Sequence, residues 1–243
     1  MREIRLFVDT PLRVGLELAL PATAAQHAVR VLRLRAGDAV TLFNGDGHQY
    51  PAQLSTIAPG VTRARVATVE SPARESPLRV TLLQALARGE KMDWIVQKAT
   101  ELGVARVAPI VTARSEVKLD AARAAKRLEH WRAIAIGACE QCGRNTVPRI
   151  DVAGSLEAFL AANAATDARF VLQPGDATRI RSLTPPPTPV TLAVGPEGGF
   201  GEDDLAALRA AGYGALSLGP RILRTETAGI AALAALQAML GDF

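Results

Sequence analysis

The chain is short of aromatic residues, cysteine and long apolar runs, and each shortage excludes a class of protein. Aromatic residues are only 4% of the 243 residues, so a core must be built mainly from Ala, Leu, Val and Ile. Two cysteines are too few for a disulfide-rich scaffold. No apolar run reaches the roughly 20 residues of a membrane helix, and the first residues lack the apolar stretch of a signal peptide. A soluble, cytoplasmic protein is expected.

Lysine is scarce as well, with 4 lysines against 24 arginines. Hydrophobic residues make up 49% and charged residues 21% of the chain, which is the composition of a globular protein. The net charge of +4 fits an anionic partner, because arginine binds phosphates in a bidentate manner and stacks on bases. A GC-rich genome would also encode an Arg- and Ala-rich chain, so the charge alone decides little.

The first 72 residues are predicted to form a small β-barrel domain with one helix. Strands are expected over 5–9, 16–20, 39–43, 50–57 and 62–70. Asn44-Gly45-Asp46-Gly47 predicts a hairpin turn, and Thr23 is the expected cap of a helix that runs to Leu34. The proline-bracketed stretch 71–77 predicts a linker.

Residues 73–243 alternate between strand and helix patterns, which predicts an α/β sheet domain. Strands are expected over 79–86, 106–111, 169–173, 190–194 and 215–219. Helices are expected over 92–102, 120–142 and 226–240, with shorter ones after Ser155 and from Glu202. The last helix is apolar on nearly all sides, so it is expected to be buried in a core or a dimer interface.

Two loops that follow predicted strands carry the strongest chemical signals. Gly195–Gly201 reads GPEGGFG, and its glycines would let the backbone approach a ligand closely. Its spacing is neither that of a dinucleotide-binding loop nor that of a P-loop. Leu218–Ala228 reads LGPRILRTETA, with Thr225 as the expected helix cap. Together the loops predict a ligand crevice at the carboxyl edge of the sheet, although a tight turn and a surface ion pair are the structural alternatives.

The remaining motifs are weaker. Cys139-x-x-Cys142 lies within a predicted helix without a second cysteine pair, so a structural role is favoured over a metal or redox site. The chain has three histidines and no metal-ligand spacing, so no metal is expected. No G-x-S-x-G context supports a covalent hydrolase.

Six segments resemble the ribosomal RNA small subunit methyltransferase E family, of the SPOUT class. They are HAVRVLRL…GDAVTLFNGDG (27–47), GEKMDWIVQKATELGV (89–104), VKLD (117–120), IAIGACEQCGRNTVP (134–148), GPEGGF (195–200) and LGPRILRTETA (218–228). The resemblance covers essentially the whole chain in order, and the last two segments are highly specific as a pair. It also places the C-x-x-C within a family segment, which favours its structural role.

The resemblance implies a SPOUT α/β domain with a trefoil knot, preceded by a PUA-like RNA-binding barrel. It implies a homodimer that uses S-adenosylmethionine to methylate N3 of a uridine in 16S rRNA. The substrate would be the assembled small ribosomal subunit, and no metal would be needed.

The resemblance implies a cofactor site, while the chemistry of methyl transfer and the positions of polar and basic residues suggest the other roles. The expected cofactor site, placed in the knot, comprises Leu172, Gly195, Pro196, Glu197, Gly198, Gly199, Leu218, Gly219, Ile222, Leu223, Arg224, Thr227 and Ala228. Arg224 is expected to face the uracil oxygens, while Glu197 or Glu226 acts as a base or only holds a loop. Polar and basic residues expected to contact RNA are His27, Arg30, Arg33, Arg88, Lys91, Gln141 and Arg144.

Three other functions remain open at this point. A related knotted methyltransferase could act on transfer RNA or on a ribose 2′-hydroxyl group. A non-catalytic RNA-binding factor in ribosome assembly could share the barrel. A nicotinamide-dependent oxidoreductase is disfavoured, because the glycine spacing is wrong for a dinucleotide.

Overall fold

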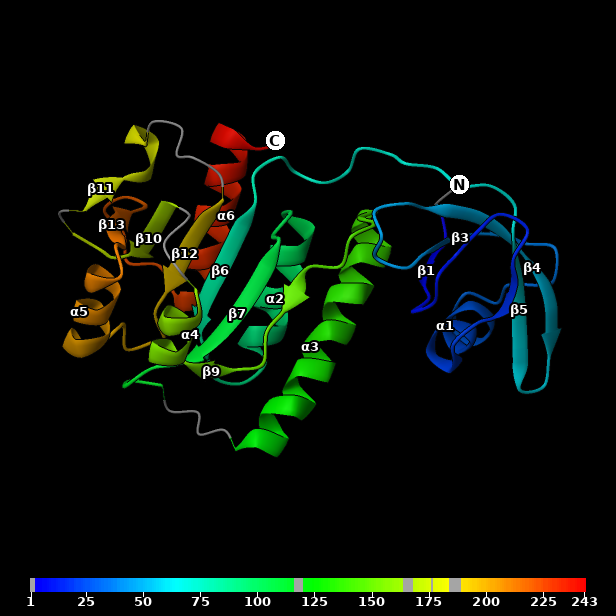
Figure 1. The fold of residues 1–243 in the computed structure, drawn as a ribbon, viewed down its shortest axis with the longest axis horizontal. Coiled ribbons are helices and arrows are strands. Elements are labelled where there is room, and N and C mark those ends of the chain that lie inside the picture. Colours follow the sequence, from blue (N-terminus) through cyan, green and yellow to red (C-terminus); the bar gives the residue numbers. More distant parts are fainter. Residues whose placement is uncertain (1–2, 116–119, 164–167, 176, 184–188) are drawn as a thin grey trace. The chain divides into compact units, whose positions relative to one another are not determined.

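The computed structural model describes residues 3–115, 120–163, 168–175, 177–183 and 189–243 (Figure 1). The chain divides into two compact units, the first made of residues 1–75 and 136–147, the second of residues 76–135 and 148–243. Residues 117–119 of the predicted VKLD segment lie outside the described residues. None of the described helices is both long enough and apolar enough to cross a membrane.

The first unit is built on a five-stranded sheet in the order β1-β3-β4-β5-β2. Its elements are β1 (Arg5–Phe7), β2 (Glu17–Ala19), α1 (Ala22–Gln26), η1 (His27–Val31), β3 (Ala39–Phe43), β4 (Tyr50–Ala58) and β5 (Val61–Val66). Leu6, Leu42 and Leu54 share one core with Ala24 of α1. All five predicted strands are therefore confirmed, as is the hairpin turn between β3 and β4.

The predicted helix from Thr23 to Leu34 differs from the structure at both ends. The predicted cap is wrong, because α1 begins at Ala22 and Pro21 occupies the N-cap position. Proline suits a helix start, since its φ is fixed near the helical value and it has no N–H to leave unpaired. After Gln26 the backbone continues as a π-helix, η1, which ends at Val31.

An ion pair in the first unit joins a buried arginine to a partly exposed glutamate: Arg144 Nη2 is 2.6 Å from Glu75 Oε2, and the Arg144 side chain is only 6% exposed. Arg5 Nη2 donates hydrogen bonds to Asn145 Oδ1 (2.6 Å) and to the carbonyl oxygen of Arg144 (3.1 Å). This pairing does not favour the predicted RNA contact of Arg144, which stays a prediction. Its guanidinium is enclosed within this unit and bound to a carboxylate.

Cys139 of the C-x-x-C motif is buried in the first unit, and neither cysteine forms a disulfide. Burial raises the pKa of the Cys139 thiol to about 12. Because the thiolate is the reactive form of cysteine, this thiol is inert at neutral pH.

The second unit is built on an eight-stranded sheet in the order β11-β13-β10-β12-β6-β7-β8, with β9 beside β7. Its strands are β6 (Val80–Ala85), β7 (Arg106–Val111), β8 (Arg149–Ile150), β9 (Gly154–Ser155), β10 (Ala168–Leu172), β11 (Thr178–Arg179), β12 (Val190–Val194) and β13 (Gly214–Ser217). Its helices are α2 (Lys91–Glu101), α3 (Ala121–Cys142), whose last turns are counted with the first unit, α4 (Leu156–Ala162), η2 (Ile180–Ser182), α5 (Glu202–Ala210) and α6 (Thr225–Leu240).

Every described strand pair in this sheet is parallel. Helices α4 and α5 cover one face, where Leu83 and Ala193 are buried. Helix α6 covers the other face, where Gly229 packs against Leu82 and Val194 (Figure 1). Parallel sheets are covered on both faces, which explains why β6 and β12 read as nearly continuous apolar runs.

The five long strands predicted for this unit are confirmed, and Ser155 caps α4 by accepting a hydrogen bond from Ala158 N (3.1 Å). Strands β8, β9 and β11 were missed, because two residues carry no periodicity. The core of this unit buries only part of the last helix, and the expected burial of the rest in a dimer interface stays a prediction. Leu233 and Leu236 of α6 are fully buried, whereas Met239 is 39% exposed.

Gln237 of α6 is fully buried and joins the C-terminal helix to Ser76, the residue at which the second unit begins. Its Oε1 accepts a hydrogen bond from Ser76 Oγ (2.6 Å), and its Nε2 donates one to the carbonyl oxygen of Leu102 (2.9 Å). A buried polar group that loses its partner costs the free energy of desolvation. The amide is therefore a structural requirement of this unit.

Replacing Gln237 by leucine should lower the free energy of unfolding by about 1–3 kcal/mol, because the partly buried Ser76 hydroxyl and Leu102 carbonyl lose their partner. Urea denaturation would measure the change. Gln97→Leu is the matched control, since Gln97 is an exposed glutamine in α2 of the same unit. Equal effects of the two substitutions would contradict the role of Gln237.

Candidate functional site

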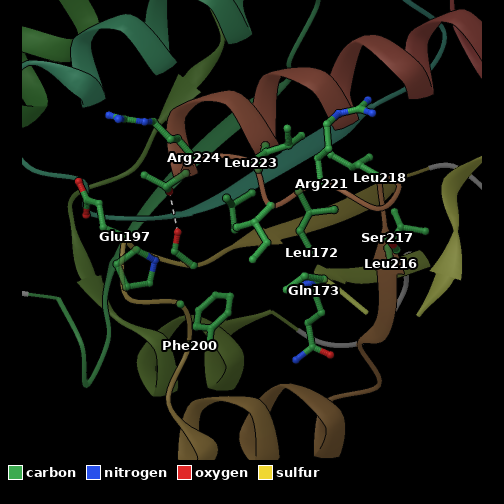
Figure 2. A pocket seen from close by; sticks show the side chains of 18 of the residues that line it. Leu172, Gln173, Glu197, Phe200, Leu216, Ser217, Leu218, Arg221, Leu223 and Arg224 are labelled. Atoms are coloured by element: carbon green, nitrogen blue, oxygen red, sulfur yellow. Dashed lines mark hydrogen bonds between the residues drawn. The ribbon is translucent and has the colours of Figure 1, made fainter. Parts of the chain in front are cut away.

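A cavity of about 580 Å³ opens where three neighbouring parallel strands of the second unit end (Figure 2). Its lining comes from the ends of β10, β12 and β13 and the loops that follow them, together with the start of α6. Because β13, β10 and β12 are adjacent and parallel, their carboxyl ends meet at one edge of the sheet. The cavity thus lies where the two glycine-containing loops predicted a crevice.

The glycine loop after β12 is a tight turn whose geometry strongly favours glycine at two positions. A Cβ atom on Gly195 would lie 3.0 Å from Phe200 N and 3.2 Å from the carbonyl carbon of Gly199. Gly199 has a left-handed φ of 69°, and its N–H donates a hydrogen bond to the carbonyl oxygen of Pro196 (2.9 Å). A Cβ on Gly199 would meet no protein atom within 4 Å, so this side of the loop faces open space.

Thr225 links this loop to the sheet and to α6. Its hydroxyl donates a hydrogen bond to the carbonyl oxygen of Gly195 (2.6 Å) and accepts one from Nε2 of the buried Gln84 (3.0 Å). The prediction that Thr225 caps the last helix is wrong, because Arg224 occupies the N-cap position and Thr225 is the first helical residue. The hydroxyl bridges β6, the glycine loop and α6.

Lys91 forms a second link at the edge of the cavity. Its Nζ lies 2.8 Å from Glu197 Oε1 and 3.4 Å from Glu226 Oε2. The backbone N–H of Arg88 donates a hydrogen bond to the same Glu197 oxygen (3.2 Å). The ammonium of Lys91, predicted to contact RNA, is instead held between two carboxylates.

These contacts set the charge states of the pair. Burial by itself raises the pKa of Glu197, but the hydrogen bonds from Lys91 and from backbone N–H groups outweigh it and bring the pKa below its ordinary value. The hydrogen bond to Glu197 raises the pKa of Lys91. Both groups are charged at neutral pH, and Glu197 is a weaker base than an ordinary glutamate.

The cavity has an apolar wall and a charged mouth. Leu172 and Leu223 lie in the middle of the view in Figure 2, and Arg224 and Arg221 extend away from each other on either side. Ile222 at the mouth is 84% exposed. An apolar wall with a few polar groups is typical of a site for a small organic ligand.

Nearly all residues predicted for a cofactor line this one cavity. The exception is Thr227, whose exposed side chain on α6 lies outside the lining. Sequence reasoning missed Gln173, Phe200 and Ser217, which also line it. Gln173 directly follows β10, so its place at a strand end was the signal available for it.

Among the catalytic predictions, Arg224 and Glu197 line the cavity, and Glu226 joins Glu197 through Lys91. Arg114, which was not predicted, supports the glycine loop, because its Nη1 donates a hydrogen bond to the carbonyl oxygen of Gly198 (3.0 Å).

The residues predicted to contact RNA fall in both units. His27, Arg30 and Arg33 are exposed in the first unit, as is Gln141 near the end of α3. Arg88 is exposed just before α2 in the second unit. Across the described part of the chain, no group of three or more His, Cys, Asp or Glu side chains could hold a metal ion. The binding roles of all these residues stay predictions.

Comparison with known proteins identifies relatives over the whole chain. Residues 74–237 match the family described as RNA methyltransferase domain, and residues 20–60 match RNA methyltransferase PUA domain. The chain is 34% identical to the ribosomal RNA small subunit methyltransferase E of Bacillus subtilis (strain 168), over 86% of this chain and 85% of that protein. The protein of the same name from Mycobacterium tuberculosis is also 34% identical, over 94% and 89%.

Two solved structures agree with the fold over 100% of both chains. The ribosomal RNA small subunit methyltransferase E from Neisseria gonorrhoeae, bound to S-adenosyl methionine, has a TM-score of 0.93 and 36% identity. A methyltransferase from Legionella pneumophila, in complex with its bound cofactor SAM, has a TM-score of 0.95 and 40% identity.

Replacing Thr225 by valine should loosen the glycine loop, because Gly195 and Gln84 lose their common partner. We expect faster hydrogen exchange at the Gly199 amide and a loss of about 1–3 kcal/mol in the free energy of unfolding. Thr227→Val, an exposed threonine in the same helix turn, is the control. Unchanged exchange in Thr225→Val would show that the hydroxyl does not hold the loop.

Proposed function

Because the chain belongs to the ribosomal RNA small subunit methyltransferase E family, we propose that it methylates N3 of a uridine in 16S rRNA with S-adenosylmethionine as the methyl donor. The observation that supports this most directly is the agreement of the whole chain with a family structure bound to S-adenosyl methionine. The cavity at the strand ends of the second unit, of about 580 Å³, is large enough for a small organic cofactor.

The residues of the cavity fit the cofactor. The open space beside Gly199 lets a ligand approach the loop backbone, and the leucines of the wall suit an adenine ring. When bound, S-adenosylmethionine supplies the methyl group as an electrophile on a positively charged sulfur. Leu172, Leu218 and Leu223 would keep water from that sulfur, while glycine-loop N–H groups would hold the adenosine.

Arg224 is proposed to act on the uracil. Attack by N3 requires loss of the imide proton, which leaves negative charge on the two uracil oxygens. The Arg224 side chain is exposed at the mouth of the cavity, so its guanidinium can face those oxygens and stabilise the charge. Its main contribution would then be to the transition state rather than to cofactor affinity.

The two candidate bases are not equivalent. Glu197 accepts hydrogen bonds from Lys91 and Arg88, and its pKa is lowered, so it is better suited to holding the glycine loop. The Glu226 side chain is 18% exposed and lies farther from Lys91 Nζ, at 3.4 Å. We therefore propose that Glu197 supports the loop, which leaves Glu226 as the candidate base, although its side chain lies outside the cavity lining and is also paired with Lys91.

The finer features implied by the family belong to the same proposal. They are a trefoil knot around the cofactor site, a division into domains 1–72 and 73–243, a cytoplasmic location and action on the assembled small subunit. A homodimer is proposed as well. The partly exposed apolar side of α6, which includes Met239, would be a suitable interface.

Incubation with labelled S-adenosylmethionine and small subunits from cells that lack the modification tests the function. After nuclease digestion, mass spectrometry should identify 3-methyluridine. A ribose-methylated nucleoside would contradict the proposed target. Cofactor binding without methylation would point to transfer RNA, and no cofactor binding would favour a non-catalytic assembly factor.

Replacing Arg224 by alanine should lower kcat by about 100-fold or more, since one stabilising group of the transition state is lost. Cofactor affinity, measured by calorimetry, should stay within about twofold. Arg221→Ala is the control, because Arg221 extends from the same loop in the opposite direction (Figure 2). Full turnover in Arg224→Ala would reject the role.

A further inference from the structure

Two large apolar side chains are exposed next to each other in the first unit. Val31 is 64% exposed and Leu32 is 37% exposed, although Ala28 before them is fully buried. Both neighbours, Arg30 and Arg33, are exposed as well. A single exposed apolar residue is ordinary, but an adjacent pair within a fully exposed stretch calls for an explanation.

The backbone displays this pair through an unusual helix end. The π-helix η1 closes with a hydrogen bond from Leu32 N to the carbonyl oxygen of His27 (3.0 Å), and Leu34 N bonds to that of Ala28 (3.0 Å). Arg33, between Leu32 and Leu34, has a φ of 55°. Among the described residues other than glycine, it is the one with a positive φ. This hydrogen-bond pattern ends a helix, and the residue in the left-handed conformation, here Arg33, is usually glycine at such an end.

The arginine at that position is informative because glycine would adopt the same backbone without strain. The Arg33 side chain is exposed, so packing does not account for it. Strained backbone and π-turns are concentrated at functional sites, which supports an inference from the observed geometry to a role for the guanidinium.

The segment that carries the pair is cationic in sequence, and a carboxylate from another element, that of Glu140, interacts with His27. From the start of α1 to Asp38 the chain carries no Asp or Glu, and His27, Arg30, Arg33 and Arg35 are all exposed. Asp38 Oδ2 accepts a hydrogen bond from the backbone N–H of Arg35 (2.7 Å). Within the described ranges, the carboxylates that form ion pairs have partners other than Arg30 and Arg33. The charge favours a polyanion over an apolar protein groove.

We propose that the turn formed by residues 27–35 binds unpaired RNA, with Val31 and Leu32 packed against nucleobases and Arg30 and Arg33 on the flanking phosphates. Bases in an A-form duplex are stacked, so apolar side chains can reach their faces only where the RNA is single-stranded. The proposal deepens the proposed function and rests on it for the class of substrate.

Fluorescence anisotropy with a single-stranded, uridine-containing RNA oligonucleotide and with the matching duplex tests the apolar pair. The double variant Val31→Ser, Leu32→Ser should bind the single strand about tenfold more weakly, with an unchanged salt slope. Val69→Ser is the matched control, since Val69 is 49% exposed elsewhere in the same unit. All three sites are at the surface, so thermal unfolding should be unaffected.

Arg33→Gly tests the arginine separately from the fold. Glycine relieves the backbone strain, so the variant should be at least as stable as the parent protein, yet it should bind the RNA more weakly and lower the salt slope by about one. A purely structural role would instead leave RNA affinity unchanged.

Three results would overturn the inference. They are parental affinity in the double variant, equal weakening for duplex and single strand, or a defect seen only with intact small subunits, which would indicate a protein contact. If the parental protein methylates small subunits but the variants of the turn bind RNA as tightly as it does, the inference is rejected and the proposed function stands. RNA binding through the turn without any methylation would reject the proposed function and leave the inference standing.

Discussion

The site depends on the parallel pairing of β13, β10 and β12. Val171 in the middle strand is level with Ala193 on one side and Ala215 on the other, so the three strands end at the same edge of the sheet. Each loop after a strand then opens into the same space, although the loops are far apart in sequence. An antiparallel neighbour would place its loop at the opposite edge and leave the cavity without one wall.

Two polar links keep these loops in place, and they differ in kind. The Thr225 hydroxyl is a buried, neutral link, which salt and moderate pH leave intact. The Lys91 pair with Glu197 and Glu226 is partly exposed, so water and salt weaken it more readily. The inner part of the cavity is therefore held more rigidly than its mouth, where a large substrate would have to enter.

Much of the fold could be predicted from sequence, because the long strands and helices carry clear periodicity and the two loops have unusual composition. The remainder depended on contacts between distant residues. Nothing local shows that the Thr225 hydroxyl bonds to Gly195, or that the charge of Arg144 is buried against Glu75. The π-helix after Gln26 was missed for a similar reason, since local patterns do not distinguish it from an ordinary helix.

The bond between Ser76 and Gln237 has a consequence for the order of folding. It joins residues 161 positions apart, and the central strand β6 pairs with β12, which is made more than a hundred residues later. Such contacts form only after the entropy of closing a long loop has been overcome. During synthesis, the edge of β6 that pairs with β12 stays unpaired until residues 190–194 have emerged, so the centre of this sheet closes late and exposes a strand edge that could aggregate before then.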